Sequence, residues 1–323
     1  MYYMGIDVGS VSTDIVLIDE ESNVVDGLYL RTKGRPIQVI QDGFRKLREK
    51  YRDEDIRSVG TTGSGRKISG FLVGADSVKN EITAHAVAAL EIDPQVKTII
   101  EIGGQDSKII ILKDGIVTDF AMNTVCAAGT GSFLDRQAER LGVPIENFGV
   151  MALESKNSVR IAGRCAVFAE SDMIHKQQVG HKQEDIIRGL CEALVRNYLN
   201  NVGKGKDIKD KIFFQGGVAA NEGMKKVFEE TLGTNVYVPK HYGLMGAIGA
   251  AILSKERVKA QGYTNFKGFN VSESAFSSES FECTGCPNGC EIISIKSDGV
   301  IIGNLGDRCG KWSSVNSQVT VSS

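Results

Sequence analysis

Short apolar runs separated by Gly-rich or polar turns open the chain, and this alternation predicts β-hairpins. The first turn, at Val8–Val11, is rich in Gly and Ser, and a polar turn follows at Glu20–Asn23. Three strands are therefore predicted, at Tyr3–Asp7, Thr13–Ile18 and Val24–Leu30. A helix is predicted at Pro36–Lys50, because apolar residues recur there at the spacing of one helical face.

The same arrangement returns in a second segment of the chain. Strands are predicted there at Thr98–Gly103, Lys108–Lys113 and Ile116–Met122. Around the first turn of each segment, IDVGSVSTDIVLI aligns with IEIGGQDSKIIIL without a gap, which sets Asp7 opposite Glu101 and Gly9 opposite Gly103. This internal repeat indicates a duplicated fold in which two similar units follow one another.

Helical periodicity dominates the chain after the second hairpin segment. Helices are predicted at Gly131–Leu141, Ala166–Gln177, Glu184–Val202, Asn221–Leu232 and Gly243–Ser254. Two short strands are predicted between them, at Lys211–Phe214 and Val236–Val238. The composition then becomes polar and rich in Ser and Gly. We therefore expect a domain over residues 1–255, a linker over 256–280 and a four-cysteine module over 281–323.

Composition and charge narrow the class of protein. The 323 residues are 41% hydrophobic and 24% charged, which is typical of a soluble globular protein with a sizeable core. The net charge is −2 and no Lys/Arg run occurs, so no nucleic-acid partner is expected. No apolar stretch approaches the roughly 18–20 residues of a membrane span. The start, MYYMGIDVG, lacks the features of a secretion signal, so we expect a cytoplasmic protein without a membrane partner.

The two Gly-rich hairpins each carry carboxylates at the turn and together favour a nucleotide site. Backbone N–H groups at such turns bind phosphate oxygens, and carboxylates hold hydrated Mg²⁺ or orient an attacking water. The candidate catalytic residues are Asp7, Glu101, Gln105 and Asp106, with Gln105 orienting the water. The candidate nucleotide contacts are Gly9, Ser10, Ser12, Thr13, Gly103 and Gly104. A pair of ordinary Gly hairpins is the alternative, and the chain contains neither a P-loop nor a Rossmann motif.

A third Gly cluster, FFQGGVAANEGM, is typical of a strand that turns into a helix, and Gly243, Gly246 and Gly249 follow it at intervals of three. Duplicated phosphate hairpins followed by such a motif resemble the actin, Hsp70 and sugar-kinase ATPase fold. The resemblance implies an α/β class, a duplicated actin-like (ribonuclease H-like) ATPase fold with two lobes. A small C-terminal cysteine-rich β-hairpin module would follow it. The implied adenosine-side contacts are Gln215, Gly216, Gly217, Asn221, Gly243, Met245 and Gly246.

Two cysteines in the middle of the chain, Cys126 and Cys165, each precede a predicted helix. The dipole and free N–H groups at a helix N-terminus stabilise a thiolate. The thiolate is the form in which a cysteine binds an iron–sulfur cluster. A 4Fe–4S cluster usually takes four thiolates, and a two-fold dimer would supply each residue twice. Spacing alone nevertheless favours two small buried cysteines, and Cys191, on the apolar stripe of its helix, fits that interpretation.

The segments around these cysteines, NTVCAAGTGSFLD and IAGRCAVFAES, closely resemble the cluster segments of the activators of 2-hydroxyacyl-CoA dehydratases. The same superfamily includes the ATP-dependent reductase components of benzoyl-CoA and double-cubane-cluster enzymes. The resemblance covers residues 1–255 and extends to the nucleotide motifs EIGGQDSK and FFQGGVAANEGM. It implies a homodimer with two ATP sites and one 4Fe–4S cluster held by Cys126 and Cys165 of both subunits. It also adds Gly129 and Gly131 to the nucleotide contacts.

The function that the resemblance implies is that of an ATP-hydrolysing iron–sulfur reductase of anaerobic metabolism. ATP hydrolysis with Mg²⁺ would drive one low-potential electron from the cluster to an acceptor metalloenzyme. The acceptor would be dehydratase-like, a benzoyl-CoA reductase or a double-cubane-cluster protein, with ferredoxin or flavodoxin as the electron donor. Two alternatives stay open: a small-molecule, sugar-like kinase of the same fold with a structural zinc site, and a non-catalytic ATP-sensing or chaperone-like protein.

Four further cysteines lie near the C-terminus with the spacing C-x₂-C-x₃-C-x₁₈-C, namely Cys283, Cys286, Cys290 and Cys309. Four thiolates from two loops at the ends of a hairpin can form a tetrahedral metal site. Zn²⁺ is the favoured ion, because it would fold a module too small to fold alone. An iron–sulfur cluster, acting as an additional electron relay, is the alternative.

Overall fold

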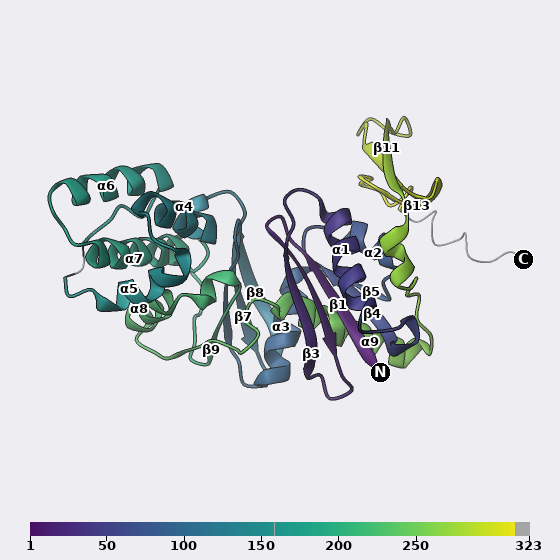
Figure 1. Ribbon diagram of the computed structural model, residues 1–323, viewed down its shortest axis with the longest axis horizontal. Helices are drawn as coiled ribbons and strands as arrows, with labels where there is room; N and C mark the ends of the chain where they lie inside the picture. Colours follow the sequence, from purple (N-terminus) through teal and green to yellow (C-terminus); the bar gives the residue numbers. More distant parts are fainter. Residues whose placement is uncertain (158, 314–323) are drawn as a thin grey trace, which may run out of the picture. The chain divides into compact units, whose positions relative to one another are not determined.

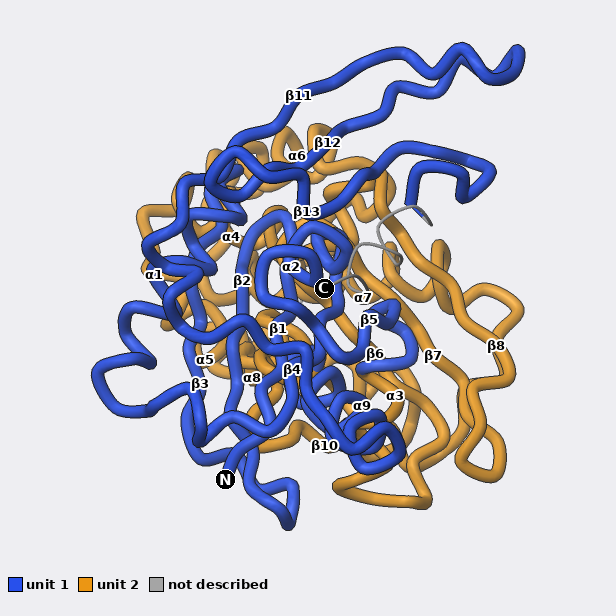
Figure 2. Tube along the Cα trace, turned by 90° about the vertical axis from the view of Figure 1, so that its right-hand side faces the viewer, with its two compact units in different colours: residues 1–84, 246–323 blue, residues 85–245 orange. Residues whose placement is uncertain are grey.

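The computed structural model describes residues 1–157 and 159–313, which contain both helices and strands (Figure 1). Within these residues, no helix combines the length and apolar character that a membrane crossing requires. The chain divides into two compact units, coloured separately in Figure 2. The first unit consists of Met1–Ala84 and the stretch that begins at Gly246, and the second unit is His85–Met245.

The first unit contains a five-stranded sheet with the strand order β3-β2-β1-β4-β5. Its strands are β1 (Tyr2–Val8), β2 (Ser12–Ile18), β3 (Val24–Arg31), β4 (Ile56–Thr62) and β5 (Ser77–Val78). The first three strands pair antiparallel, whereas β4 pairs parallel to both β1 and β5. Two helices, α1 (Pro36–Arg48) and α2 (Arg66–Val73), pack their apolar residues against this sheet, and Phe44 of α1 is fully buried in the core.

Helix α9 (Met245–Gln261) lies against the strands of the first unit at glycine positions. A Cβ atom at Gly5 of β1 would overlap the Ala247 carbonyl oxygen, and one at Gly60 of β4 would overlap that of Ala250. The small residues on both sides therefore permit a close approach of helix and sheet. Further along, Gly249 packs in the same way against Ala84 of α3 (Glu81–Ile92).

The second unit repeats the sheet topology of the first. Its strands are β6 (Thr98–Ile102), β7 (Ser107–Lys113), β8 (Ile116–Asn123), β9 (Ile212–Gln215) and β10 (Val236–Tyr237). The order is β10-β9-β6-β7-β8, with an antiparallel meander from β6 to β8 and parallel pairing of β9 with β6 and β10. Two sheets of one topology are what a duplicated actin-like fold requires.

Five further helices complete the second unit. They are α4 (Gly131–Leu141), α5 (Ile145–Glu154), α6 (Ala166–Gln178), α7 (Gln183–Asn201) and α8 (Glu222–Leu232). Helix α7 is central, since it contacts α4, α5, α6 and α8. Its buried residues include Cys191, for which burial raises the pKa of the thiol to about 12. Cys191 is therefore a core residue, as its place on the apolar stripe predicted.

The residues after α9 differ from the predicted linker over 256–280. Helix α9 continues to Gln261, and in the short 3₁₀ segment Phe269–Glu273 both Phe269 and Val271 are buried. The ring of Phe269 stacks edge-on against Phe44 of α1, with the centroids 5.5 Å apart. The segment is polar on average, but its buried apolar side chains and hydrogen bonds from the Gln41 amide of α1 to its carbonyl oxygens hold it to the first unit.

The C-terminal module is a three-stranded antiparallel sheet in place of the predicted β-hairpin. Its strands are β11 (Phe276–Glu282), β12 (Glu291–Ser297) and β13 (Val300–Leu305). The additional strand, β11, precedes the first cysteine and pairs with β12 along its whole length. Gly303 of β13 lies directly against the ring of Phe71 in α2, so the module packs on the first unit. The last residues of the predicted module, 314–323, lie outside the described residues.

Candidate functional site

The hairpin of β1 and β2 gathers polar oxygens around Asp7. Asp14 faces Asp7 across the antiparallel pair, and Thr62 faces it across the parallel pair with β4. Asp14 and Thr62 are 6% and 0% exposed. Among the described residues, neither Asp14 Oδ1 nor Thr62 Oγ1 has a hydrogen-bond partner. Buried oxygens of this kind usually meet a ligand, an ion or water, so this hairpin has unused capacity to bind a cation.

Burial, and then the charge of Asp7, raises the pKa of Asp14 well above its usual value. The hydroxyl of Ser12 donates a hydrogen bond of 3.3 Å to Asp14 Oδ2 and opposes that shift. Two carboxyl groups thus lie side by side at the end of this hairpin. A bound cation would favour the ionised form of both.

The turn residues predicted to contact phosphate have different roles in the structure. Ser10 is exposed, and the Gly9 N–H donates a hydrogen bond of 2.8 Å across the turn to the Ser12 carbonyl. Thr13 is fully buried, and its hydroxyl forms a 3.0 Å hydrogen bond with that of Thr32. Thr13 therefore supports the hairpin from within and does not present its hydroxyl to a ligand.

A Gly-rich loop that the sequence analysis missed lies beside this hairpin. It follows β4 and contains Gly63, Ser64 and Gly65. Gly63 has a φ of +84°, and a Cβ atom there would overlap the Asp7 carboxylate. The Gly65 N–H donates a hydrogen bond of 2.9 Å to the Val8 carbonyl. The segment TTGSGR after a strand was the signal, because only glycine fits so close to Asp7 with a positive φ.

The second hairpin, of β6 and β7, neutralises its carboxylates internally. The Lys108 ammonium donates hydrogen bonds of 2.9 Å to Glu101 Oε2 and to Asp106 Oδ2. Burial alone would lower the pKa of Lys108, but the charges of Glu101 and Asp106 outweigh it and raise the pKa overall. Glu101 is 4% exposed, whereas Gln105 at the turn is exposed. The Lys108 ammonium therefore balances the negative charge of Glu101 within the protein.

The two hairpins differ in charge at one equivalent position. Lys108 faces Glu101 across the antiparallel pair in the second unit, and Asp14 faces Asp7 in the first. The first hairpin therefore carries two carboxyl groups, and the second carries its own cation. Mg²⁺ fits the residues of the first hairpin better than those of the second.

Helix α4 begins directly at the Gly turn of the second hairpin. The N–H groups of Gly131 and Ser132 donate hydrogen bonds of 2.9 Å and 2.8 Å to the carbonyl oxygens of Gly103 and Gly104. Gly131 thus stabilises this turn by its hydrogen bond to the Gly103 carbonyl. These amides are committed within the protein, so a phosphate contact at the turn falls to the N–H groups of the turn itself.

The third Gly cluster follows β9. Gly216 has a φ of +84° and lies so close to the Ile102 carbonyl that a Cβ atom would overlap it. Gly217 and Gly243, in contrast, have open space where a side chain would be. Gln215 Oε1 lies 2.8 Å from His85 Nδ1, a contact that the sequence analysis did not foresee.

The remaining residues of the predicted adenosine side are buried or cap a helix. Asn221 caps α8, since its Oδ1 accepts a hydrogen bond of 2.9 Å from the Met224 N–H. Among the residues that the structure describes, Asn221 Nδ2 and Gln215 Nε2 are buried without a hydrogen-bond partner. Met245 is fully buried at the end of the second unit, and Gly246 begins the second stretch of the first.

Both cysteines of the predicted cluster are half-buried free thiols of the second unit. Cys165 directly precedes α6, whereas Cys126 precedes only a short 3₁₀ turn, Ala127–Gly129, ahead of α4. The expected dipole of a long helix is thus present at Cys165 only. Exposed apolar side chains flank both thiols: Val125 is 94% exposed, and Val167 and Phe168 are each 68% exposed. Large exposed apolar side chains thus lie next to both cysteines, as they would at a protein interface.

The four C-terminal cysteines lie at one end of the small sheet, because β11 ends, β12 begins and β13 ends there. The Cys283 N–H donates a hydrogen bond of 2.8 Å to the Cys290 carbonyl, and the Trp312 indole donates one of 3.3 Å to Cys283 Sγ. The indole hydrogen bond lowers the pKa of the Cys283 thiol. Across residues 1–157 and 159–313, no three His, Cys, Asp or Glu side chains converge on a metal position. The topology thus assembles these cysteines loosely, short of a closed tetrahedral site.

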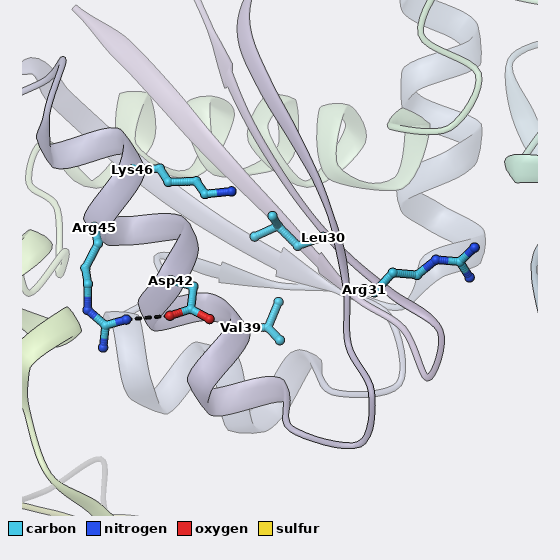
Figure 3. Close-up of a pocket in the computed structure, with 6 residues that line it drawn as sticks. All are labelled: Leu30, Arg31, Val39, Asp42, Arg45 and Lys46. Atoms are coloured by element: carbon cyan, nitrogen blue, oxygen red, sulfur yellow. Dashed lines mark hydrogen bonds and ion pairs between the residues drawn. The ribbon is translucent and has the colours of Figure 1, made fainter.

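A hollow of about 370 Å³ lies on the first unit between β3 and α1 (Figure 3). Its lining residues are Leu30, Arg31, Val39, Asp42, Arg45 and Lys46. Arg45 forms an ion pair with Asp42, and the Arg31 side chain points away from both. None of the predicted site residues belongs to this lining.

Known proteins resemble this chain over most of its length. The model of the BadF/BadG/BcrA/BcrD ATPase family matches residues 4–254. The (R)-2-hydroxyglutaryl-CoA dehydratase activating ATPase of Acidaminococcus fermentans is 33% identical over 80% of this chain and 98% of its own. The solved activator of the 2-hydroxyisocaproyl-CoA dehydratase from Clostridium difficile, with bound ADPNP, has a TM-score of 0.72 at 32% identity. It covers 81% of this chain and 97% of its own.

A more distant structure resembles the chain in fold alone. The glucokinase of the ROK family from Streptomyces griseus, solved with glucose and AMPPNP, has a TM-score of 0.50 at 14% identity. It covers 79% of this chain and 100% of its own. The fold is therefore shared with sugar kinases, while the relatives of substantial identity named above are dehydratase activators. The sugar-kinase alternative is not favoured.

Proposed function

Because the chain belongs to the BadF/BadG/BcrA/BcrD ATPase family, we propose that it is an ATP-hydrolysing activator that passes a low-potential electron to a partner metalloenzyme. The observation that carries the proposal is the pair of free thiols, Cys126 and Cys165, in a surface of exposed apolar side chains. A small-molecule kinase does not need a pair of thiols at such a surface. An activator that shares a cluster between two subunits requires it.

For the nucleotide, we propose that the Gly turns of both hairpins bind the phosphates of ATP. The backbone N–H groups of Ser10 and Gly104 are the donors suited to phosphate oxygens. Those of Gly9 and Gly103 already donate across their turns, to the Ser12 and Asp106 carbonyl oxygens. Mg²⁺, when bound, neutralises phosphate charge, and Asp7 with the orphaned oxygens of its neighbours would hold it through water. Gln105, exposed at its turn, would orient the attacking water.

The adenosine side of the proposed site uses the third Gly cluster. Gly217 and Gly243 leave open space, and Gln215 and Asn221 each carry a buried amide nitrogen with unused hydrogen-bonding capacity. These features suit a flat base and a ribose. Asp106 is paired with Lys108, and Thr13 with Thr32, so we assign both to supporting the hairpins.

For the cluster, we propose that Cys126 and Cys165 of two subunits together supply four thiolates. The cluster, when bound, carries a single electron. In such a homodimer, Val125, Val167 and Phe168 would be covered, which accounts for their exposure in a single chain. Each chain then needs only two thiolates, in keeping with two free cysteines in its second unit besides the buried Cys191.

Iron analysis of the anaerobically prepared dimer tests the proposal. We expect about four iron atoms per dimer and their loss in Cys126→Ala and in Cys165→Ala. The matched control is Cys191→Ala, which removes a thiol of the same unit but from the core, and it should retain the iron. A wild-type protein that hydrolyses ATP yet contains no iron would refute the electron-transfer function.

The partner follows from the same proposal. A dehydratase-like metalloenzyme, a benzoyl-CoA reductase or a double-cubane-cluster protein would accept the electron, and ferredoxin or flavodoxin would supply it. This assignment is supported by the relatives that activate 2-hydroxyacyl-CoA dehydratases. It extends to a benzoyl-CoA reductase component of Thauera aromatica, which is 26% identical over 263 residues.

We propose a structural zinc ion for the C-terminal module, supported by four thiols at one end of its sheet. The sulfur atoms would have to move closer together than they are, since they form no closed group of ligands in the described residues. About one zinc per chain, lost in Cys286→Ala with the iron retained, is the expected result. About four additional iron atoms per chain in place of zinc would make the module an electron relay.

A further inference from the structure

One buried side chain of α7 contacts both cysteine segments. The Asn197 amide nitrogen donates a hydrogen bond of 2.6 Å to the carbonyl oxygen of Gly163, two residues before Cys165. The same nitrogen is the donor to the Cys126 sulfur, at 3.9 Å. Asn197 is only 4% exposed, so water does not compete for these contacts. A single amide group therefore joins two segments that are far apart in the sequence.

The orientation of this amide is fixed by its other atom. Asn197 Oδ1 accepts a hydrogen bond of 2.8 Å from the Asn201 side chain, one turn further along α7. A Cβ atom at Gly129 would lie 2.7 Å from that oxygen, so the glycine lets the Cys126 turn approach. With Oδ1 held by Asn201, Nδ2 is directed at Gly163 and at the Cys126 sulfur.

Neighbouring contacts hold each segment in place around Asn197. The Arg196 guanidinium donates a hydrogen bond of 2.6 Å to the Ile161 carbonyl. A Cβ atom at Gly163 would lie 2.8 Å from the Ala193 carbonyl, so this segment runs directly along α7. On the other side, Asn123 donates to the Cys126 carbonyl at 2.8 Å and accepts from the Cys126 N–H at 2.9 Å. Asn197 is the residue where the two sets of contacts meet.

From these contacts we infer that Asn197 is the positioning residue for both cluster cysteines and tunes the cluster through an N–H···S hydrogen bond to Cys126. The inference rests on the proposed function, because it takes the Cys126 sulfur as a cluster ligand. Hydrogen bonds to the ligating sulfurs are one of the factors that set the potential of an iron–sulfur cluster. Such a bond favours the more negatively charged, reduced form, so its loss lowers the reduction potential.

The sharpest variant is Asn197→Asp, which keeps the shape and the acceptor oxygen but replaces the amide nitrogen with a second oxygen. We expect the midpoint potential of the cluster to become more negative. A tenfold change in the reduction equilibrium corresponds to about 59 mV for a one-electron couple. The matched control is Asn200→Asp, an identical change at an exposed position of the same helix, which should leave the potential unchanged.

A second readout does not depend on the cluster. In the iron-free protein, hydrogen–deuterium exchange at Cys126 and Gly129 should become about tenfold faster or more in Asn197→Asp, because the hydrogen bond to Gly163 is lost. Should that variant not fold, Asn197→Ala is measured in the same two ways. Faster exchange in a protein that never binds iron would keep the positioning role and reject the proposed function. Wild-type potential together with wild-type exchange would overturn the inference.

Discussion

Lys108→Met should lower the free energy of unfolding by about 3–5 kcal/mol, the usual consequence of removing one partner of a buried ion pair. Lys108 and Glu101 have side chains that are 5% and 6% exposed, and a 2.9 Å hydrogen bond joins them. Methionine fills a similar volume but leaves the Glu101 carboxylate buried without this ammonium. Urea-induced unfolding of the full chain, followed by circular dichroism, measures the change.

The control for this prediction is an exposed ion pair of the same unit. Lys209 lies 2.7 Å from Asp207, with side chains 56% and 72% exposed, so Lys209→Met should change stability by less than about 1 kcal/mol. Adding Glu101→Gln to Lys108→Met removes the buried charge and should recover part of the loss. Equal effects of the two lysine variants would show that burial of the Lys108 pair does not contribute.

The duplication was the part of the fold that the sequence determined most clearly. Strands such as Thr13–Ile18 contain a continuous apolar run, here Ile15–Ile18, and the two hairpin turns align residue by residue. Strand β4 and helix α2 were missed, because β4 reads IRSVGTT and carries few apolar side chains. It is buried because it pairs between β1 and β5 and because Gly60 admits α9, and neither condition is visible in a local pattern.

The candidate site was predictable in its residue types and less so in their roles. The carboxylates of both hairpins were found from the repeat, which also sets Lys108 opposite Asp14. That Lys108 pairs with Glu101 depends on cross-strand register, which the alignment of the repeat does not include. Asn197 was counted neither as core nor as site, because a polar residue on a buried helix face acquires meaning only from the loops that it contacts.

Asp14→Asn tests the charge difference between the hairpins and should stabilise the protein at neutral pH. The pKa of Asp14 is raised in the folded state, first by burial and then by Asp7. The folded protein therefore binds more protons than the unfolded chain at any pH above the ordinary carboxyl value of about 3.9 and below the raised pKa. In that window the stability of the wild type falls as pH rises, because folding must bind a proton to a carboxylate that is ionised in the unfolded chain.

Asparagine carries no charge at any pH, so the stability of the variant does not fall with rising pH in this way. The difference in unfolding free energy between variant and wild type should be small near pH 4. It should grow with pH in favour of the variant by up to about 1.4 kcal/mol for each unit that the window spans. Measurements without Mg²⁺ and nucleotide keep both carboxyl groups unligated. The control is Asp210→Asn, at an exposed site, for which the difference should not change with pH.

Because added Mg²⁺ would stabilise the ionised pair, it should narrow the difference for Asp14→Asn if the first hairpin binds the cation. A difference that does not change with pH would mean that Asp14 is ionised at no cost in the folded state. The argument that the first hairpin needs an external cation, where the second has Lys108, would then fail.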